Sequence, residues 1–183
     1  EPYLAESFSV IQDGKLWSYK LRTDLYCDDG MAITPQSFVE ALKTQILAYS
    51  KKSRPIDFDL LIGFDDFIDG KDKKIKGLRA EGQNIVFEFT KRPEDLNEML
   101  RMPYFGFWCP SSFVDGEWKR SQKFSSSGPY KLKQITEDGS IIVQKRSEWF
   151  SVTKESINEI IFSYSNPNSL TATHNSRIIE TST

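Results

Sequence analysis

Three stretches of the chain alternate between apolar and polar residues on either side of a turn signal. They run over Leu4–Arg22, Ile75–Thr90 and Tyr130–Arg146, and their turn signals are Asp13-Gly14, Glu81-Gly82 and Asp138-Gly139. Such pairs tolerate the positive φ of a tight turn, and period-2 alternation places apolar side chains on one face of a strand. The pattern predicts three antiparallel β-hairpins, and Ile157–Tyr164 predicts one further strand.

A helical period follows the first hairpin. Thr34-Pro35 is a helix start, with a side-chain cap before a proline at the first helical position. The apolar residues after it fall near i, i+4 and i+8, at Phe38, Val39, Leu42, Ile46 and Leu47. We expect a helix at about residues 35–49 and shorter helices over Leu60–Asp69 and Glu94–Arg101. The fold class is therefore α+β, with antiparallel hairpins packed against a few helices.

The segment Tyr26–Leu42, "YCDDGMAITPQSFVEAL", puts two aspartates and a glycine just before the longest helix. A metal loop would need further oxygen ligands, which the following Met31-Ala32-Ile33 does not supply. A phosphate-binding loop would need a run of glycines and a lysine. We therefore interpret Asp28-Asp29-Gly30 as a turn that joins a strand to the capped helix.

Composition limits the classes of partner. The chain has 183 residues, 38% of them hydrophobic, which is enough for a core. Its formal net charge of −2 is unlike that of a nucleic-acid-binding domain, and the short basic run Lys71–Lys76 is interpreted as a solvated strand edge. Cys27 and Cys109 lack metal-ligand spacing. A disulfide between them is left open, and two separate structural thiols are the preferred interpretation.

No catalytic group stands out. His174 is the only histidine and lies in a segment without periodicity. There is no G-x-S-x-G motif, and Ser125-Ser126-Ser127 before Gly128-Pro129 is interpreted as a flexible loop. The 26 acidic residues are scattered, so no carboxylate pair is singled out. The sequence predicts no enzyme activity, no metal and no cofactor.

The aromatic stretch Tyr104–Trp108, "YFGFW", is the strongest candidate for a binding surface. Aromatic clusters beside a backbone break line many pockets, because they offer contact area at low rotamer cost. They also fill cores, and core packing is the preferred interpretation, with one or two of them lining a pocket.

The order of these elements resembles the N-terminal part of the family 5 extracellular solute-binding proteins, the peptide-, dipeptide- and nickel-binding components of ABC importers. The matching segments are Leu4-Ala5-Glu6-Ser7, Trp17–Arg22, Asp29-Gly30, Thr34, Phe38-Val39, "IGFDDFIDGK" at Ile62–Lys71, and "SGPYKLKQITEDGSIIVQKRSEWF" at Ser127–Phe150. Pro35-Gln36-Ser37 replaces an alanine and an acidic residue of the family pattern, and Ser147 replaces an asparagine. The ordered set covers roughly Pro2–Tyr164.

The resemblance implies part of a periplasmic-binding-protein type II-like fold. Residues 1–124 would form an accessory α+β subdomain of the N-terminal lobe, and residues 125–165 would begin the main first lobe. Residues 166–183 would be an irregular tail or truncated remainder. Family members are about three times longer and have a second large lobe, so the chain is expected to be a fragment.

The function that the resemblance implies is capture of peptides or similar small solutes for an ABC importer, without chemistry. The protein would be a monomer that docks on a membrane permease. It would lie in the periplasm or be anchored outside the cytoplasmic membrane as a lipoprotein. The ligand contacts expected in this portion are Phe58, Tyr104, Phe105, Phe107 and Trp108.

Three other functions remain open on the sequence. The same fold could serve as the ligand-sensing domain of a cytoplasmic transcriptional regulator. Alternatively, the likeness could be architectural only, in a hydrolase or an adhesion module. A converging carboxylate pair would favour the hydrolase, and a broad exposed aromatic patch would favour the adhesion module.

Overall fold

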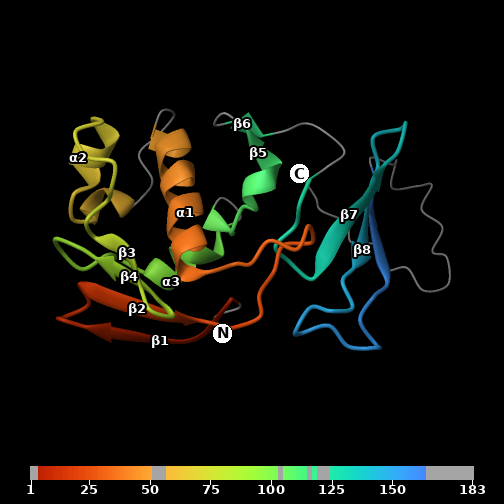
Figure 1. Ribbon diagram of the computed structural model, residues 1–183, viewed down its shortest axis with the longest axis horizontal. Helices are drawn as coiled ribbons and strands as arrows, with labels where there is room; N and C mark the ends of the chain where they lie inside the picture. The colour runs from red at the N-terminus through yellow and green to blue at the C-terminus, as the bar shows by residue number, and fades with distance from the viewer. Residues whose placement is uncertain (1–3, 51–56, 103–104, 115–116, 119–123, 164–183) are drawn as a thin grey trace. The chain divides into compact units, whose positions relative to one another are not determined.

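The computed structural model describes residues 4–50, 57–102, 105–114, 117–118 and 124–163 (Figure 1). The backbone contacts divide the chain into two compact units. The first unit is Glu1–Leu25 with Ala32–Trp108, and the second unit is Tyr26–Met31 with Cys109–Thr183. This division falls at residue 108, and the subdomain boundary predicted at residue 124 stays a prediction. The equivalence of either part to a lobe of a larger receptor stays a prediction.

The first unit contains a four-stranded antiparallel sheet with the strand order β1-β2-β4-β3. The strands are β1 (Ala5–Ile11), β2 (Leu16–Leu21), β3 (Leu78–Glu81) and β4 (Asn84–Glu88). Both predicted hairpins of this unit are confirmed as β1–β2 and β3–β4. Pairing of β2 with β4, in which Trp17 lies opposite Phe87, joins the two hairpins into one sheet.

Helix α1 (Pro35–Ser50) begins where the sequence predicts and ends one residue beyond the predicted end. Thr34 Oγ1 accepts the backbone N–H of Ser37 at 3.1 Å, and Ser37 Oγ accepts the backbone N–H of Thr34 at 2.8 Å. This is a reciprocal capping box in which serine stands where glutamate or glutamine is usual. Helix α1 packs against β3 and β4 (Figure 1).

The predicted helix over Leu60–Asp69 is two shorter elements, η1 (Phe58–Leu60) and α2 (Phe64–Ile68). Leu61 is extended and forms an isolated bridge with Phe89, and Gly63 has a φ of 80°, so the helix cannot run through them. Helix α3 (Leu96–Arg101) is shorter than the predicted Glu94–Arg101, because Asp95 caps it by accepting the N–H groups of its second and third residues.

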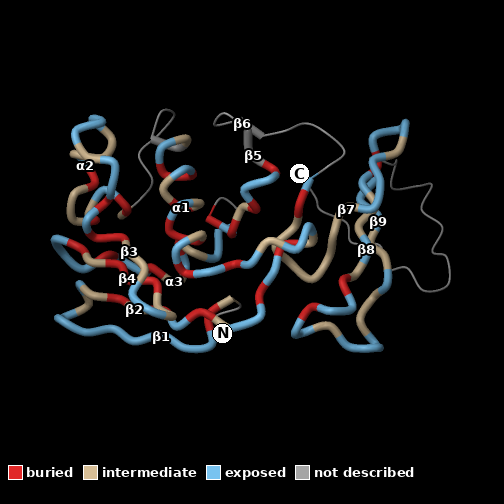
Figure 2. Tube along the Cα trace, viewed as in Figure 1, coloured by how far each residue is buried: buried red, intermediate tan, exposed pale blue. Residues whose placement is uncertain are grey.

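The core of the first unit lies between the sheet and its helices, and β2, β4 and α1 each contribute several buried positions to it (Figure 2). Of the five apolar residues predicted for the buried stripe of α1, four are buried and Leu47 is 39% exposed. Gln45 is buried instead and donates from Nε2 to the carbonyl of Gly106 at 2.6 Å. A buried side-chain amide whose hydrogen bond is satisfied therefore lies at a position that the apolar pattern of the sequence does not mark as buried.

The second unit contains a three-stranded antiparallel sheet of β7 (Tyr130–Ile135), β8 (Ile141–Lys145) and β9 (Glu159–Phe162), in that order. The third predicted hairpin and the further strand are confirmed by this sheet. A turn of 3-10 helix, η3 (Pro110–Ser112), precedes the short pair β5 (Phe113–Val114) and β6 (Glu117–Trp118), which the alternation pattern does not reveal.

One face of the three-stranded sheet is apolar and partly exposed. Leu132, Val143 and Ile160 lie opposite one another across the three strands and share that face. Ile141 and Phe162 are also paired on it, and they are 41% and 48% exposed. The apolar alternation of β8 therefore forms a face, as predicted, on which Leu132, Val143 and Ile160 are half-buried and Ile141 and Phe162 are exposed.

Candidate functional site

The predicted ligand-contacting aromatics are packed into the first unit. Phe58 is fully buried and packs edge to face on Phe105, with ring centroids 4.8 Å apart. Phe107 is buried against Phe38 of α1, with ring centroids 5.9 Å apart. Phe58, Phe105 and Phe107 are thus parts of the core, and for Phe105 and Phe107 this is the interpretation that the sequence favours. Their predicted role as ligand contacts stays a prediction.

The other two predicted ligand contacts are Trp108 and Tyr104. Trp108 is half-buried, so part of its indole surface is open to solvent in this chain. Tyr104 lies outside the described residues, as does His174. Trp108 is therefore the described member of the set with the most surface left for a partner.

The turn at Asp28-Asp29-Gly30 is confirmed. Gly30 has a φ of 87° and donates its N–H to the carbonyl of Cys27 at 3.0 Å. Cys27 in turn donates to the carbonyl of Met31 at 2.9 Å, which closes the loop. A positive φ of this size suits glycine, as the sequence pattern predicts.

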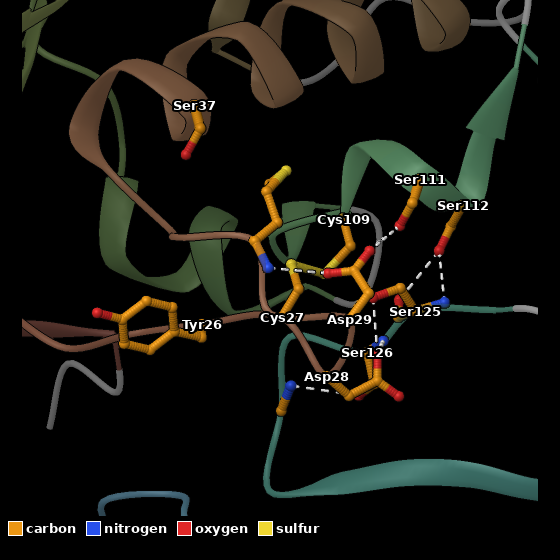
Figure 3. Close-up of a disulfide and its surroundings, with 12 residues drawn as sticks. Tyr26, Cys27, Asp28, Asp29, Ser37, Cys109, Ser111, Ser112, Ser125 and Ser126 are labelled. Carbon is orange, nitrogen blue, oxygen red and sulfur yellow. Dashed lines mark hydrogen bonds between the residues drawn. A yellow bond between two sulfur atoms is a disulfide. The ribbon is translucent and has the colours of Figure 1, made fainter.

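The two cysteines form a disulfide, so the preferred interpretation of two separate thiols is wrong. Cys27 and Cys109 are bonded, with their Cα atoms 6.1 Å apart, and both are buried (Figure 3). They are 82 residues apart in the sequence, and only the fold brings them together. Both belong to the second unit.

A cluster of serines surrounds the two aspartates of the turn (Figure 3). Asp28 Oδ1 accepts the hydroxyl of Ser125 at 2.7 Å and the backbone N–H of Ser126 at 2.8 Å. Ser112 Oγ accepts the N–H of Ser125 at 2.8 Å and donates to the carbonyl of the same residue at 3.0 Å. Ser125–Ser127 lies outside helices and strands, as the predicted loop requires, and Ser125 and Ser126 are held there by hydrogen bonds.

Asp29 has its own partners. Its Oδ2 accepts the hydroxyl of Ser111, and its Oδ1 accepts the backbone N–H of Met31 at 3.1 Å. The hydrogen bond from Ser111 is the main reason that the pKa of Asp29 is lowered from its usual value. The fold thus favours the ionised carboxylate.

Arg146, just after β8, is the most heavily bonded side chain of the second unit. It is only 3% exposed. Its Nη1 donates to the carbonyls of Ser126 and Gly128, both at 3.1 Å, and its Nη2 donates to the carbonyl of Tyr26 at 2.9 Å. Its Nε bonds Glu148 at 2.9 Å, which lowers the pKa of that carboxyl.

Arg146 also stacks on Trp149, with its guanidinium carbon 5.0 Å from the ring centroid. The planar fork satisfies three loop carbonyls at once, and the indole covers its face. Nothing in the sequence marks Arg146 as special among 24 basic residues. Its role depends on loops that only the fold brings together.

The cluster around Asp28, Asp29 and Arg146 is held together by hydrogen bonds. Among the described residues, no group of three or more His, Cys, Asp or Glu side chains is placed to hold a metal ion. In the same parts of the chain, no helix has the length and apolar composition that a membrane span requires.

Comparison with curated proteins gives relatives of one kind. The chain is 28% identical to the oligopeptide-binding protein SarA of Streptococcus gordonii, in an alignment that covers 89% of this chain and 26% of SarA. It is 23% identical to the periplasmic oligopeptide-binding protein OppA of Escherichia coli, covering 88% of this chain and 31% of OppA. The chain thus spans about a quarter to a third of the length of these relatives.

Solved structures share the fold. A periplasmic oligopeptide-binding protein, OppAIV of Borrelia burgdorferi, matches with a TM-score of 0.75 at 20% identity, covering 90% of this chain and 34% of that one. OppA of Haemophilus influenzae, solved in complex with the peptide RPPGFSPFR, matches with a TM-score of 0.73 at 21% identity, covering 89% and 33%. The fold class expected from the resemblance is therefore confirmed.

The family itself is shown by the sequence. The model of the bacterial extracellular solute-binding proteins, family 5 Middle, matches residues 1–178. That match covers nearly the whole chain, including the turn at Asp28-Asp29-Gly30 and the hairpin of β7 and β8. The chain belongs to the family 5 bacterial extracellular solute-binding proteins.

Proposed function

We propose that the protein to which this chain belongs captures peptides outside the cytoplasmic membrane and delivers them to an ABC importer. The observation that carries the proposal is the family match over residues 1–178, together with relatives that are named as oligopeptide-binding proteins. Because the chain spans only about a third of those relatives, the binding activity is proposed for the whole protein.

The disulfide supports an extracytoplasmic location. Disulfides form and persist in oxidising compartments, whereas reducing systems keep cytosolic thiols free. Cys27 and Cys109 are bonded and buried, which suits a protein that folds in the periplasm or outside the membrane. The same observation weighs against the alternative of a cytoplasmic transcriptional regulator, and the relatives named above are peptide-binding proteins. Lipoprotein anchoring is part of the proposal.

The proposed protein performs no chemistry and works as a monomer. Affinity would come from enclosing a peptide between two lobes, where hydrogen bonds are shielded from water. The first unit would belong to the accessory subdomain, and the sheet of β7, β8 and β9 would begin the main first lobe. The 183-residue chain alone, lacking the second lobe, is expected to bind peptides weakly.

The ligand-contacting residues remain part of this proposal. Trp108 is the first to test, because its indole is partly exposed. Phe58, Phe105 and Phe107 would act mainly by shaping the wall behind a ligand, since they are buried in the core of the first unit. Tyr104 completes the proposed set.

The test is a titration of the full-length protein with peptide pools of two to nine residues and, separately, with nickel ions. Saturable binding of peptides, and recovery of co-purified peptides by mass spectrometry, would support the proposal. Trp108→Ala should weaken binding while Trp17→Phe, a change in the first unit's sheet, should not. No binding to any pool would count against peptide capture, and binding of nickel alone would replace the peptide by a metal ion.

A further inference from the structure

Gln45 is a polar side chain on the otherwise apolar buried face of α1. Phe38, Leu42 and Ile46 of the same helix are buried as well. Gln45 is only 1% exposed, and among the described residues of the first unit it is the only buried one with an amide, carboxylate or cationic side chain. Burying an amide costs free energy unless it is hydrogen-bonded, so an apolar residue would suit this position better if it only had to fill space.

The hydrogen bond of Gln45 reaches the stretch in which most of the ligand contacts are predicted. Its Nε2 donates to the carbonyl of Gly106 at 2.6 Å, across 61 positions of the sequence. Gly106 lies between Phe105 and Phe107, which are both buried, and Phe107 packs on Phe38 of α1. Gly106 is exposed and has no side chain to pack. The backbone between the two buried rings is therefore held from α1 through its carbonyl group.

Trp108 follows this part of the backbone directly. Glycine restricts its own φ and ψ very little, so the orientation of the planar peptide group after Gly106 depends on outside contacts. The carbonyl of Gly106 lies in that plane, and its bond to Gln45 orients the plane. The backbone leads from there through Phe107 to Trp108, whose indole is half-buried. The direction of the indole thus depends on a side chain of α1.

We infer that Gln45 is a positioning residue, whose amide fixes the peptide plane after Gly106 and so sets the direction in which Trp108 presents its indole to a peptide. This inference rests on the proposed function, in which Trp108 contacts the ligand. A purely structural role of the Gln45 bond would change stability alone. A positioning role also changes the orientation of the indole and the affinity for peptides.

The first test needs no ligand and follows Trp108 in the full-length protein labelled with 5-fluorotryptophan. Gln45→Met removes the amide and keeps a side chain of similar size, and Trp108→Phe identifies the fluorine resonance of Trp108. That resonance should shift or split in Gln45→Met. The resonance of Trp17, in the sheet of the same unit, should keep its position. An unchanged Trp108 resonance in Gln45→Met would overturn the inference.

Leu42→Met is the matched control. Leu42 is as buried in α1 as Gln45, and this exchange conserves volume while it leaves the bond to Gly106 in place. The Trp108 resonance and the affinity for peptides should both stay as in the native protein. A change as large as that in Gln45→Met would assign the effect to looser packing of α1 and overturn the inference.

The second test measures binding of the same peptide pools to the full-length protein by calorimetry. Gln45→Met should weaken the affinity by about three- to tenfold, which corresponds to the net contribution of one hydrogen bond. Unchanged affinity for peptides that the native protein binds would overturn the role in binding, even if the resonance shifts. If the native protein binds no peptide, the proposed function fails, and the Trp108 resonance alone decides whether Gln45 positions the indole.

Measurements on the native protein cover the case in which Gln45→Met does not fold. The side-chain amide of Gln45 should exchange its protons at least about tenfold more slowly than that of Gln36, which is exposed on the same helix. The fluorine resonance of Trp108 should be a single line, as one orientation of the indole requires. Equal exchange rates of the two amides, or several lines for Trp108, would overturn the inference.

Discussion

Gly77, immediately before β3, is a residue that no side chain can replace without moving the backbone. A Cβ atom added there would lie 2.2 Å from the carbonyl oxygen of Glu88 and 2.7 Å from the nitrogen of Ile62. The backbones of the same residues are tied together by hydrogen bonds: Gly77 donates to the carbonyl of Ile62 at 2.7 Å, Glu88 donates to the carbonyl of Gly77 at 2.7 Å, and Ile62 donates to the carbonyl of Glu88 at 3.0 Å. This close approach is the reason for glycine at this position.

We therefore expect Gly77→Ala to lower the free energy of unfolding by about 1–3 kcal/mol or more, as overpacking does elsewhere. Urea denaturation of the two proteins measures the difference. Gly128→Ala is the control, because a Cβ there meets nothing nearer than 3.9 Å and its φ is not positive. Equal losses in the two variants would contradict the role of close approach.

The lowered pKa of Asp29 predicts a dependence on pH. The fold favours the ionised carboxylate through its bond to Ser111, so this contribution to stability is present at neutral pH. It is lost as the pH falls below the ordinary aspartate pKa of about 4 and through the lowered folded value. Asp29→Asn should lower the melting temperature at pH 7 relative to the native protein. This difference in melting temperature should disappear at acidic pH, where the carboxyl of Asp29 is protonated in the folded protein. A difference that persists unchanged to low pH would contradict this.

At the scale of elements, local signals in the sequence locate most of the fold. Asp-Gly and Glu-Gly turns predict all three hairpins, and Thr34-Pro35 predicts the start of α1. Local signals fail where a distant partner decides the conformation. Leu61 forms a β-bridge with Phe89 and is therefore extended where the sequence predicts a helix. The disulfide joins residues that are 82 positions apart in the sequence.

The candidate site shows the same contrast between features set by local sequence and features set by distant contacts. The sequence predicts the turn at Asp28-Asp29-Gly30 and the core packing of Phe105 and Phe107, because glycine and aromatic patterns are local. It does not predict Arg146, whose bonds reach three loop carbonyls from separate segments. Such a role becomes visible only when the loops are placed in space.

Substitution of Arg146 tests whether this side chain holds the loops next to β8 in place. Arg146→Met would remove the Arg146 hydrogen bonds from the part-buried carbonyls of Tyr26 and Gly128, and from that of Ser126, which keeps the N–H of Asp28 as a donor. Each lost hydrogen bond to a charged group costs about 1.5–3 kcal/mol. Hydrogen exchange should quicken in β7 and β8 while β2 and β4 stay protected, because the damage is local to the second unit. Glu148→Gln is the control, since the Glu148 side chain is 62% exposed and its ion pair contributes little. Equal protection of β8 in Arg146→Met and the native protein would contradict this role.

At the scale of the whole molecule, the sheet of β7, β8 and β9 has an apolar face on which Ile141 and Phe162 are exposed. Exposed apolar faces of this kind are interaction surfaces or become cores of larger structures. The relatives are about three times longer, so the proposed full-length protein has material to cover this face. The face of Ile141 and Phe162 is the part expected to be buried.

This expectation is tested with Phe162→Thr in both lengths of the protein. In the 183-residue chain, where Phe162 is 48% exposed, the cost should be below about 1 kcal/mol. In the full-length protein it should reach about 3 kcal/mol or more, as for a buried phenylalanine. Ile161→Thr, on the opposite face and 46% exposed, is the control. A small cost in both lengths would contradict burial of the face.

The disulfide also changes the order in which the sheet of the first unit can assemble. Lys20 of β2 pairs with Asn84 of β4, 64 residues away along the chain. Through the bond between Cys27 and Cys109, the same two residues are joined by a path of only 32 residues, seven on one side and 25 on the other. Halving a loop lowers its closure entropy cost by about 0.6 kcal/mol. If the thiols are oxidised before the strands pair, the pairing of β2 with β4 becomes a shorter search. The rate of that step then depends on how soon the chain meets an oxidant.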